Sequence, residues 1–263
     1  MRFLAALVRA TCKPTQAFDP QDTPTFSIFT LFVLVFGITT VGETMILWHS
    51  RSPIIREIAL VEARDIAEQT AIFSGEERVH EQQGRAYTRL IAPSTPSGKT
   101  LRVMISSAAL LAALGMTWMA MMVLTQFFGG EEPVDHNRPR ASIRLVGIAF
   151  VPIALRRLLS GALTLATEPD SAANVTTVAE YRELIVVRFD LVSLLSWKLH
   201  GIIERFTVLL TDPFGLWALS VLASGGATLM RLPPRRALAQ TGCIAILWAV
   251  ADASLGGRLA ILA

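Results

Sequence analysis

The sequence predicts an all-α protein that crosses a membrane about five times, with additional helices in its loops and at the membrane surface. Of its 263 residues, 52% are hydrophobic and only 17% are charged, whereas a soluble domain carries about 25% charge. The mean hydropathy is +0.49. The apolar residues gather in runs long enough to cross a bilayer. This composition and this patterning predict a polytopic helical membrane protein.

Five apolar runs are the candidate membrane spans. They cover about residues 25–47, 103–128, 142–166, 213–230 and 238–254. The first run is about 33 Å long as a helix, which is enough for a hydrocarbon core of about 30 Å. The third is the weakest, because Pro152 and the pair Arg156-Arg157 interrupt it. We expect residues 1–263 to fold as a single membrane domain.

Two longer polar segments, 48–100 and 167–211, are predicted to be loops on the outer side of the membrane. The first contains two helical patterns, and Ser74-Gly75-Glu76-Glu77 has the spacing of a capping box at the start of the second. The second contains the apolar stretches 184–187 and 191–197. These stretches are too short to cross a bilayer, so we expect interfacial helices there.

Arginine and lysine residues beside the spans predict the orientation, because they tend to stay on the cytoplasmic side. They form three clusters: Arg2, Arg9 and Lys13; Arg138 and Arg140; and Arg231, Arg235 and Arg236. With an odd number of spans, all three clusters fall on one side. The amino terminus is therefore predicted to be cytoplasmic.

Charged residues inside the spans are the most unusual feature of the sequence. A charge near the bilayer centre costs about 2.5 kcal/mol or more. At 1.5 Å per residue, Arg156 and Arg157 lie about 21 Å across the membrane, Glu43 about 27 Å and Asp252 about 21 Å. We therefore hypothesise an intramembrane ionic cluster in which Glu43 and Asp252 neutralise one or both arginines. The alternative is that the third span breaks after Pro152 and the arginines extend to the outer headgroups.

The sequence contains no pattern typical of a catalytic, cofactor or metal site. Its four histidines are isolated, and it contains no P-loop, dinucleotide-binding or nucleophile-elbow motif. No basic stripe interleaved with aromatic residues indicates a nucleic-acid partner. The net charge of +3 comes mainly from arginines beside the apolar runs, where anionic headgroups would contact them. The expected partners are membrane lipids and other membrane protein subunits.

Four stretches of the chain resemble the Yip family, the Ypt-interacting multispanning membrane proteins, in its bacterial form. They are Lys13–Phe18, Ser74–Glu77, Gly129-Gly130 followed by Gly147–Pro152, and Asp212–Trp217 with Gly225 behind it. The strongest likeness is in Asp212, Phe214 and Trp217, which resemble the residues that open the family's fourth span, and Pro152 resembles its internal proline. The resemblance implies five spans, a cytoplasmic amino terminus, a bacterial cytoplasmic (inner) membrane and no catalytic residues.

Two functions are compatible with these features. The first is a non-enzymatic scaffold, assembly factor or accessory subunit of a membrane complex, because small residues in the spans permit close helix packing. These are Gly115, Gly147, Gly161, Gly225, Gly226 and Gly242. The alternative is a transporter or channel in which the intramembrane charges line a path for an ion or a small anionic solute.

Overall fold

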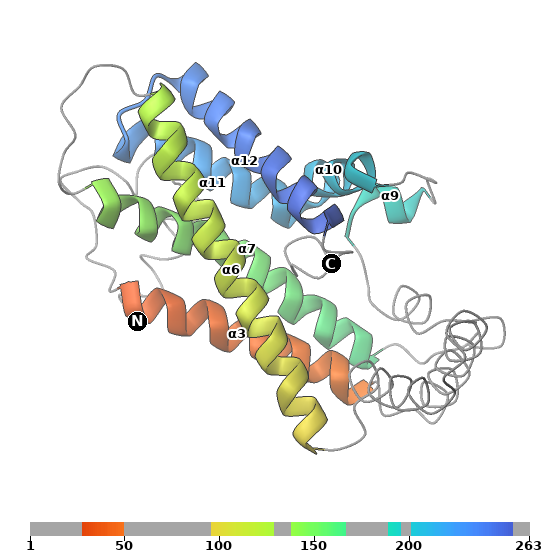
Figure 1. Cartoon of the computed structure of the whole chain (residues 1–263). Helices are drawn as coiled ribbons and strands as arrows, with labels where there is room; N and C mark the ends of the chain where they lie inside the picture. Colours follow the sequence, from red (N-terminus) through yellow and green to blue (C-terminus); the bar gives the residue numbers. More distant parts are fainter. Residues whose placement is uncertain (1–27, 50–95, 129–137, 167–188, 196–200, 255–263) are drawn as a thin grey trace, which may run out of the picture. The chain divides into compact units, whose positions relative to one another are not determined.

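The computed structural model of the protein describes residues 28–49, 96–128, 138–166, 189–195 and 201–254 (Figure 1). In chain order the helices are α3 (Ile28–His49), α6 (Pro96–Phe128), α7 (Arg138–Ala166), α9 (Leu191–Leu194), α10 (Gly201–Thr211), α11 (Pro213–Leu229) and α12 (Pro234–Ser254). These ranges contain no β-strand. The predicted all-α class is confirmed.

Four of the described helices, α3, α6, α7 and α12, are long and apolar enough to cross a membrane. A fifth crossing results if α10 and α11 are counted together as one bent span. The predicted spans 25–47, 103–128, 142–166 and 238–254 each fall on one of the four long helices. The polytopic helical fold is thus the one that the apolar runs predicted.

The predicted fourth span, 213–230, coincides with α11. The preceding residues 201–211, predicted to belong to an outer loop, form helix α10, and the chain then bends by 80° into α11. The polar residues Glu204 and Arg205 interrupt the apolar run of α10, which concealed the helix. Pro213 explains the bend, because proline lacks a backbone N–H and clashes with the preceding turn of a helix.

The start of α6 also differs from the prediction. The predicted loop extends to residue 100, whereas α6 already begins at Pro96. Proline is well suited to the first turn of a helix, because its fixed φ fits and its missing N–H would be unpaired there in any case. The loop helix expected at Ser74 and the apolar stretch 184–187 lie outside the described residues.

The described residues belong to two compact units that alternate along the chain. Unit 1 comprises Met1–Thr39, Ser107–Arg156 and Phe189–Ala263, and unit 2 comprises Thr40–Ser106 and Arg157–Arg188. Helices α3, α6 and α7 contribute residues to both units. The single-domain organisation of residues 1–263 stays a prediction.

The core of unit 1 is built around Trp248 of α12, which is fully buried. Its ring packs edge-to-face on Phe150 of α7, with the ring centroids 5.6 Å apart. Its indole N–H donates a hydrogen bond to Thr117 Oγ1 of α6 at 2.7 Å. Gln240 adds a second polar link, since its amide donates to Thr125 Oγ1 at 2.8 Å and to the Met121 carbonyl at 3.0 Å. Apolar packing and paired polar groups together fix α12 against α6 and α7.

Small residues let helices of unit 1 approach closely, as the sequence predicted for Gly225 and Gly226. A Cβ atom at Gly225 would overlap the side chain of Leu145 of α7. One at Gly226 would lie 3.5 Å from Ala237 Cβ of α12. The end of α11 is therefore packed between two neighbouring helices.

Candidate functional site

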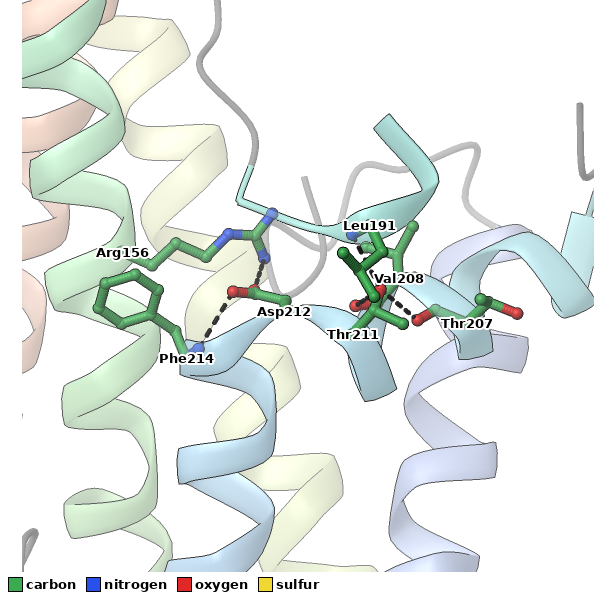
Figure 2. A network of polar contacts seen from close by, with 7 residues as sticks. All are labelled: Arg156, Leu191, Thr207, Val208, Thr211, Asp212 and Phe214. Carbon is green, nitrogen blue, oxygen red and sulfur yellow. Dashed lines mark hydrogen bonds and ion pairs between the residues drawn. The ribbon is translucent and has the colours of Figure 1, made fainter. Parts of the chain in front are cut away.

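A buried ion pair lies at the bend between α10 and α11 in unit 1. Arg156 Nη1 of α7 is 3.0 Å from Asp212 Oδ2, and the two side chains are only 6% and 1% exposed (Figure 2). A guanidinium and a carboxylate removed from solvent to this degree stabilise a fold only when they are paired. This pair is the candidate functional centre of unit 1.

Asp212 is held by the backbone on both sides of the bend. Its N–H donates to the Val208 carbonyl of α10 at 2.8 Å, and its carbonyl accepts from Leu216 N of α11 at 2.9 Å. Its Oδ1 accepts a hydrogen bond from Phe214 N at 3.1 Å, so that Asp212 is the N-cap of α11. One residue thus ends a helix, starts the next and supplies the partner of Arg156.

Gly215 makes the sharp bend sterically possible. A Cβ atom at this position would lie 2.5 Å from the carbonyl oxygen of Leu209 in α10. Such a contact is too close for any side chain, and the obstructing atom belongs to the backbone. Together with Pro213, which occupies the first position of α11, Gly215 explains why the chain bends at Asp212.

The segment 189–195 is attached to the same bend (Figure 2). Leu191 N donates to Thr211 Oγ1 at 3.3 Å, and that hydroxyl donates to the Thr207 carbonyl at 2.8 Å. The ring of Phe189 packs edge-to-face on Phe214, with the centroids 5.5 Å apart. Asp190, which is fully buried, interacts electrostatically with Asp212. Asp212 therefore has both a cationic and an anionic neighbour.

A second ion pair of unit 1 joins α10 to α12. Arg205 Nε is 3.5 Å from Asp252 Oδ2, and the aspartate is fully buried while the arginine is 20% exposed. Arg205 is one of the charged residues that interrupt the apolar run of α10. Its position is explained by this partner, because a charge inside a span requires neutralisation.

Unit 2 contains a third ion pair, between Glu43 of α3 and Arg157 of α7. Glu43 Oε1 contacts Arg157 Nη2 and accepts a further hydrogen bond from Ser106 Oγ of α6 at 3.0 Å. Glu43 is 5% exposed and Arg157 14% exposed. The carboxylate therefore links three helices within unit 2.

Two glycines bring the helices of unit 2 together beside this pair. A Cβ atom at Gly42 would lie 2.6 Å from the Arg157 carbonyl oxygen, and one at Gly161 would lie 2.6 Å from the Gly42 carbonyl oxygen. Helices α3 and α7 thus contact each other backbone to backbone, as small residues in membrane helices permit. Glu43 follows Gly42 directly, so the close contact between α3 and α7 places its carboxylate next to Arg157.

The four residues of the hypothesised cluster are distributed over these three pairs. Glu43 contacts Arg157, as the hypothesis anticipated. Arg156 pairs with Asp212, and Asp252 pairs with Arg205. The alternative, in which the third span breaks after Pro152, is wrong, because α7 continues through that proline to Ala166.

The family-motif residues fall into two groups. Asp212 and Phe214 lie at the bend, and the half-buried Trp217 packs on the core of unit 1 one turn further along α11. Pro152 is buried within α7. No sequence pattern indicates Arg205, Ser106 or Asp190, because none of them has a partner at a diagnostic sequence spacing.

The polar groups are arranged to hold helices together, and within the described ranges no three His, Cys, Asp or Glu side chains gather as metal ligands would. Comparison of the chain with protein-family models, curated proteins and solved structures gives no match. The resemblance to the Yip family therefore stays a prediction, and the interpretation of the site depends on its geometry.

Proposed function

We propose that this protein is a non-enzymatic integral membrane protein that acts as a scaffold, assembly factor or accessory subunit of a membrane complex. One observation carries the proposal. Among the described residues, the pairs Arg156–Asp212, Glu43–Arg157 and Arg205–Asp252 each join helices of one unit, so that these charged side chains serve internal packing. Buried charges used in this way stabilise a particular helix arrangement and leave the outer helix faces apolar.

The outer faces of the helices support the same proposal. Large apolar side chains are exposed there, among them Phe29, Met119, Phe127 and Leu238. The same helices contain Gly37, Gly115 and Gly242, where a Cβ atom would meet nothing within 4 Å. Such small residues let the backbone of a neighbouring helix approach closely. Lipid chains and the helices of partner subunits are the two surroundings that suit these faces.

The test is extraction of the tagged protein from its native membrane in mild detergent or nanodiscs, followed by size determination and mass spectrometry. We expect a stoichiometric assembly with other membrane proteins. Gly115→Leu and Gly242→Leu should dissociate it without unfolding the chain, since both positions are open. The matched control is Ala108→Leu, at an exposed position on α6 that lacks the glycine. Recovery of the wild-type protein as a lone monomer or homodimer would contradict the proposal.

A second candidate, a transporter or channel for an ion or a small anionic solute, is favoured by the bend at Asp212. Broken spans with charged residues at the break form the binding sites of many transporters. Here Arg156 would be the cation that meets the solute, and Asp212 its competing partner. Flux into proteoliposomes that disappears in Arg156→Leu and persists in Arg156→Lys would favour this candidate. Absence of flux across a panel of inorganic and organic anions would remove it.

A further inference from the structure

Three arginines crowd the short connection between α11 and α12. Arg231, Arg235 and Arg236 are all exposed, and we call them the arginine turn. Met230 and Leu232, in contrast, are buried at 3% exposure each and anchor the connection to unit 1. No residue of the described ranges forms an ion pair with any of the three arginines. Among the described residues their charge is therefore not neutralised.

Arg231 occupies a backbone conformation that favours glycine. Its φ is +52°, in the left-handed region, directly after the C-cap of α11 at Met230. Glycine is preferred at this position because it adopts positive φ without steric cost. An arginine here therefore adopts this conformation at a steric cost that glycine would avoid.

Arg235 and Arg236 are also placed unfavourably for folding alone. They lie in the first turn of α12, which contains no acidic residue. The helix macrodipole is positive at this end and opposes cations there. Arg236 Nη1 donates one hydrogen bond, to the Phe128 carbonyl of α6 at 3.0 Å. Because this carbonyl is uncharged, the hydrogen bond does not itself neutralise the guanidinium.

Contacts within unit 1 place a further cation at the same end. Leu145 of α7 lies against Gly225 of α11, and Ser142 of α7 accepts a hydrogen bond from the Trp118 indole of α6 at 3.0 Å. From these contacts toward its start, α7 reaches the exposed Arg140. From the same contacts toward its end, α11 reaches Arg231. Since the connection joins two apolar helices, it lies at the level of the lipid headgroups if they cross the membrane.

We propose that the arginine turn binds the phosphate of an anionic phospholipid headgroup. Guanidinium groups form paired, charge-assisted hydrogen bonds with phosphate oxygens. The backbone of the turn is restrained, because Pro233 and Pro234 restrict it and the Pro233 carbonyl accepts from Arg236 N at 2.8 Å. A restrained backbone loses less entropy on binding than a flexible one. The free energy gained by binding the anion offsets the conformational cost of the positive φ at Arg231. It also offsets the electrostatic cost of placing cations at the start of α12.

The test uses the full-length protein in detergent, titrated with phosphatidylglycerol or phosphatidylcholine and followed by native mass spectrometry. We expect the wild-type protein to retain phosphatidylglycerol preferentially. The preference should fall by about fivefold for each arginine removed in Arg231→Gly, Arg235→Gln and Arg236→Gln. Arg231→Gly is the most informative variant, because it relieves the backbone and should lower lipid binding without lowering thermal stability.

Arg140→Gln is the matched control, since it removes one exposed cation from the same end of unit 1 but outside the arginine turn. An effect as large as that of Arg235→Gln would overturn the proposal in favour of general surface charge. Unchanged lipid preference in the triple variant would also overturn it. Displacement of the lipid by equimolar inorganic phosphate would show a free-anion site instead, and displacement by an acidic peptide would show a protein partner.

Discussion

The adjacent residues Arg156 and Arg157 are held by two differently built acidic partners. In unit 1 the partner is Asp212, whose position is fixed by backbone hydrogen bonds at the junction of two helices. In unit 2 the partner is Glu43, which lies within a continuous helix and is oriented by Ser106 and by the neighbouring glycine crossing. The first pair therefore depends on a backbone bend and the second on helix proximity. This difference predicts that the two pairs respond unequally to substitution.

The largest effect is expected at Asp212. Asp212→Ala removes the N-cap of α11 and leaves Arg156 without this carboxylate, which should lower the free energy of unfolding by about 3–5 kcal/mol. Heat- or SDS-induced unfolding in detergent micelles measures the loss. Asp212→Asn keeps an oxygen for the Phe214 N–H and should recover about 1 kcal/mol of it. Equal losses in the two variants would show that the cap contributes nothing.

A methyl group at the glycine crossing of unit 2 should come next. In Gly161→Ala the added Cβ would meet the Gly42 carbonyl oxygen at 2.6 Å, and the forced separation of α3 and α7 should cost about 1–3 kcal/mol. Gly37→Ala, on α3 where the space is open, should stay within about 0.5 kcal/mol of the wild type. The same unfolding assay compares them. A Gly161→Ala protein as stable as Gly37→Ala would show that the helices can separate freely.

Removal of the Glu43 charge should have a smaller effect than removal of the Asp212 charge. Glu43→Gln keeps an acceptor for Ser106, and Arg157 is the more exposed of the two arginines, so we expect a loss of about 1–2 kcal/mol. The double variant Glu43→Gln, Arg157→Gln should be at least as stable as the single one, because no arginine charge remains there to be neutralised. A loss equal to that of Asp212→Asn would remove the distinction between the two pairs.

The smallest effect is expected for a neutral hydrogen bond in the core of unit 1. Thr117→Val removes the acceptor of the Trp248 indole N–H while conserving volume, and the loss should be about 1 kcal/mol. Thr117→Ser, which keeps the hydroxyl, is the control. Tryptophan fluorescence together with thermal unfolding follows the site, and a neutral Thr117→Val would show that the hydrogen bond adds little to the packing on Phe150.

The helical class and most of the spans could be predicted from the sequence, because each depends on local composition. A continuous apolar run of bilayer length has few alternatives to a helix. The helix over residues 201–211 was not predicted, because the charges of Glu204 and Arg205 interrupt its apolar run. Hydropathy averages over a window and cannot register that Arg205 has the carboxylate of Asp252 as a partner.

The site was predictable only in part. Depth counting brought Glu43 and Arg157 together correctly, because both lie in continuous helices with a constant rise per residue. The same counting did not indicate Asp212 as a partner of Arg156, because Asp212 lies at a bend, where the path of the chain depends on Pro213 and Gly215 instead of on helix length. The likeness to a family motif singled out Asp212 but did not indicate its partner.

The single-residue junction at Asp212 also fixes the rotational phase of α11. Each residue of an α-helix turns the chain by about 100°, so inserting one residue between Thr211 and Asp212 would rotate every side chain of α11 by that angle. Gly225 would then turn away from Leu145, and bulkier side chains would face α7 in its place. The number of residues between α10 and α11 therefore determines which face of α11 is buried, and an insertion or deletion here would be more disruptive than most substitutions.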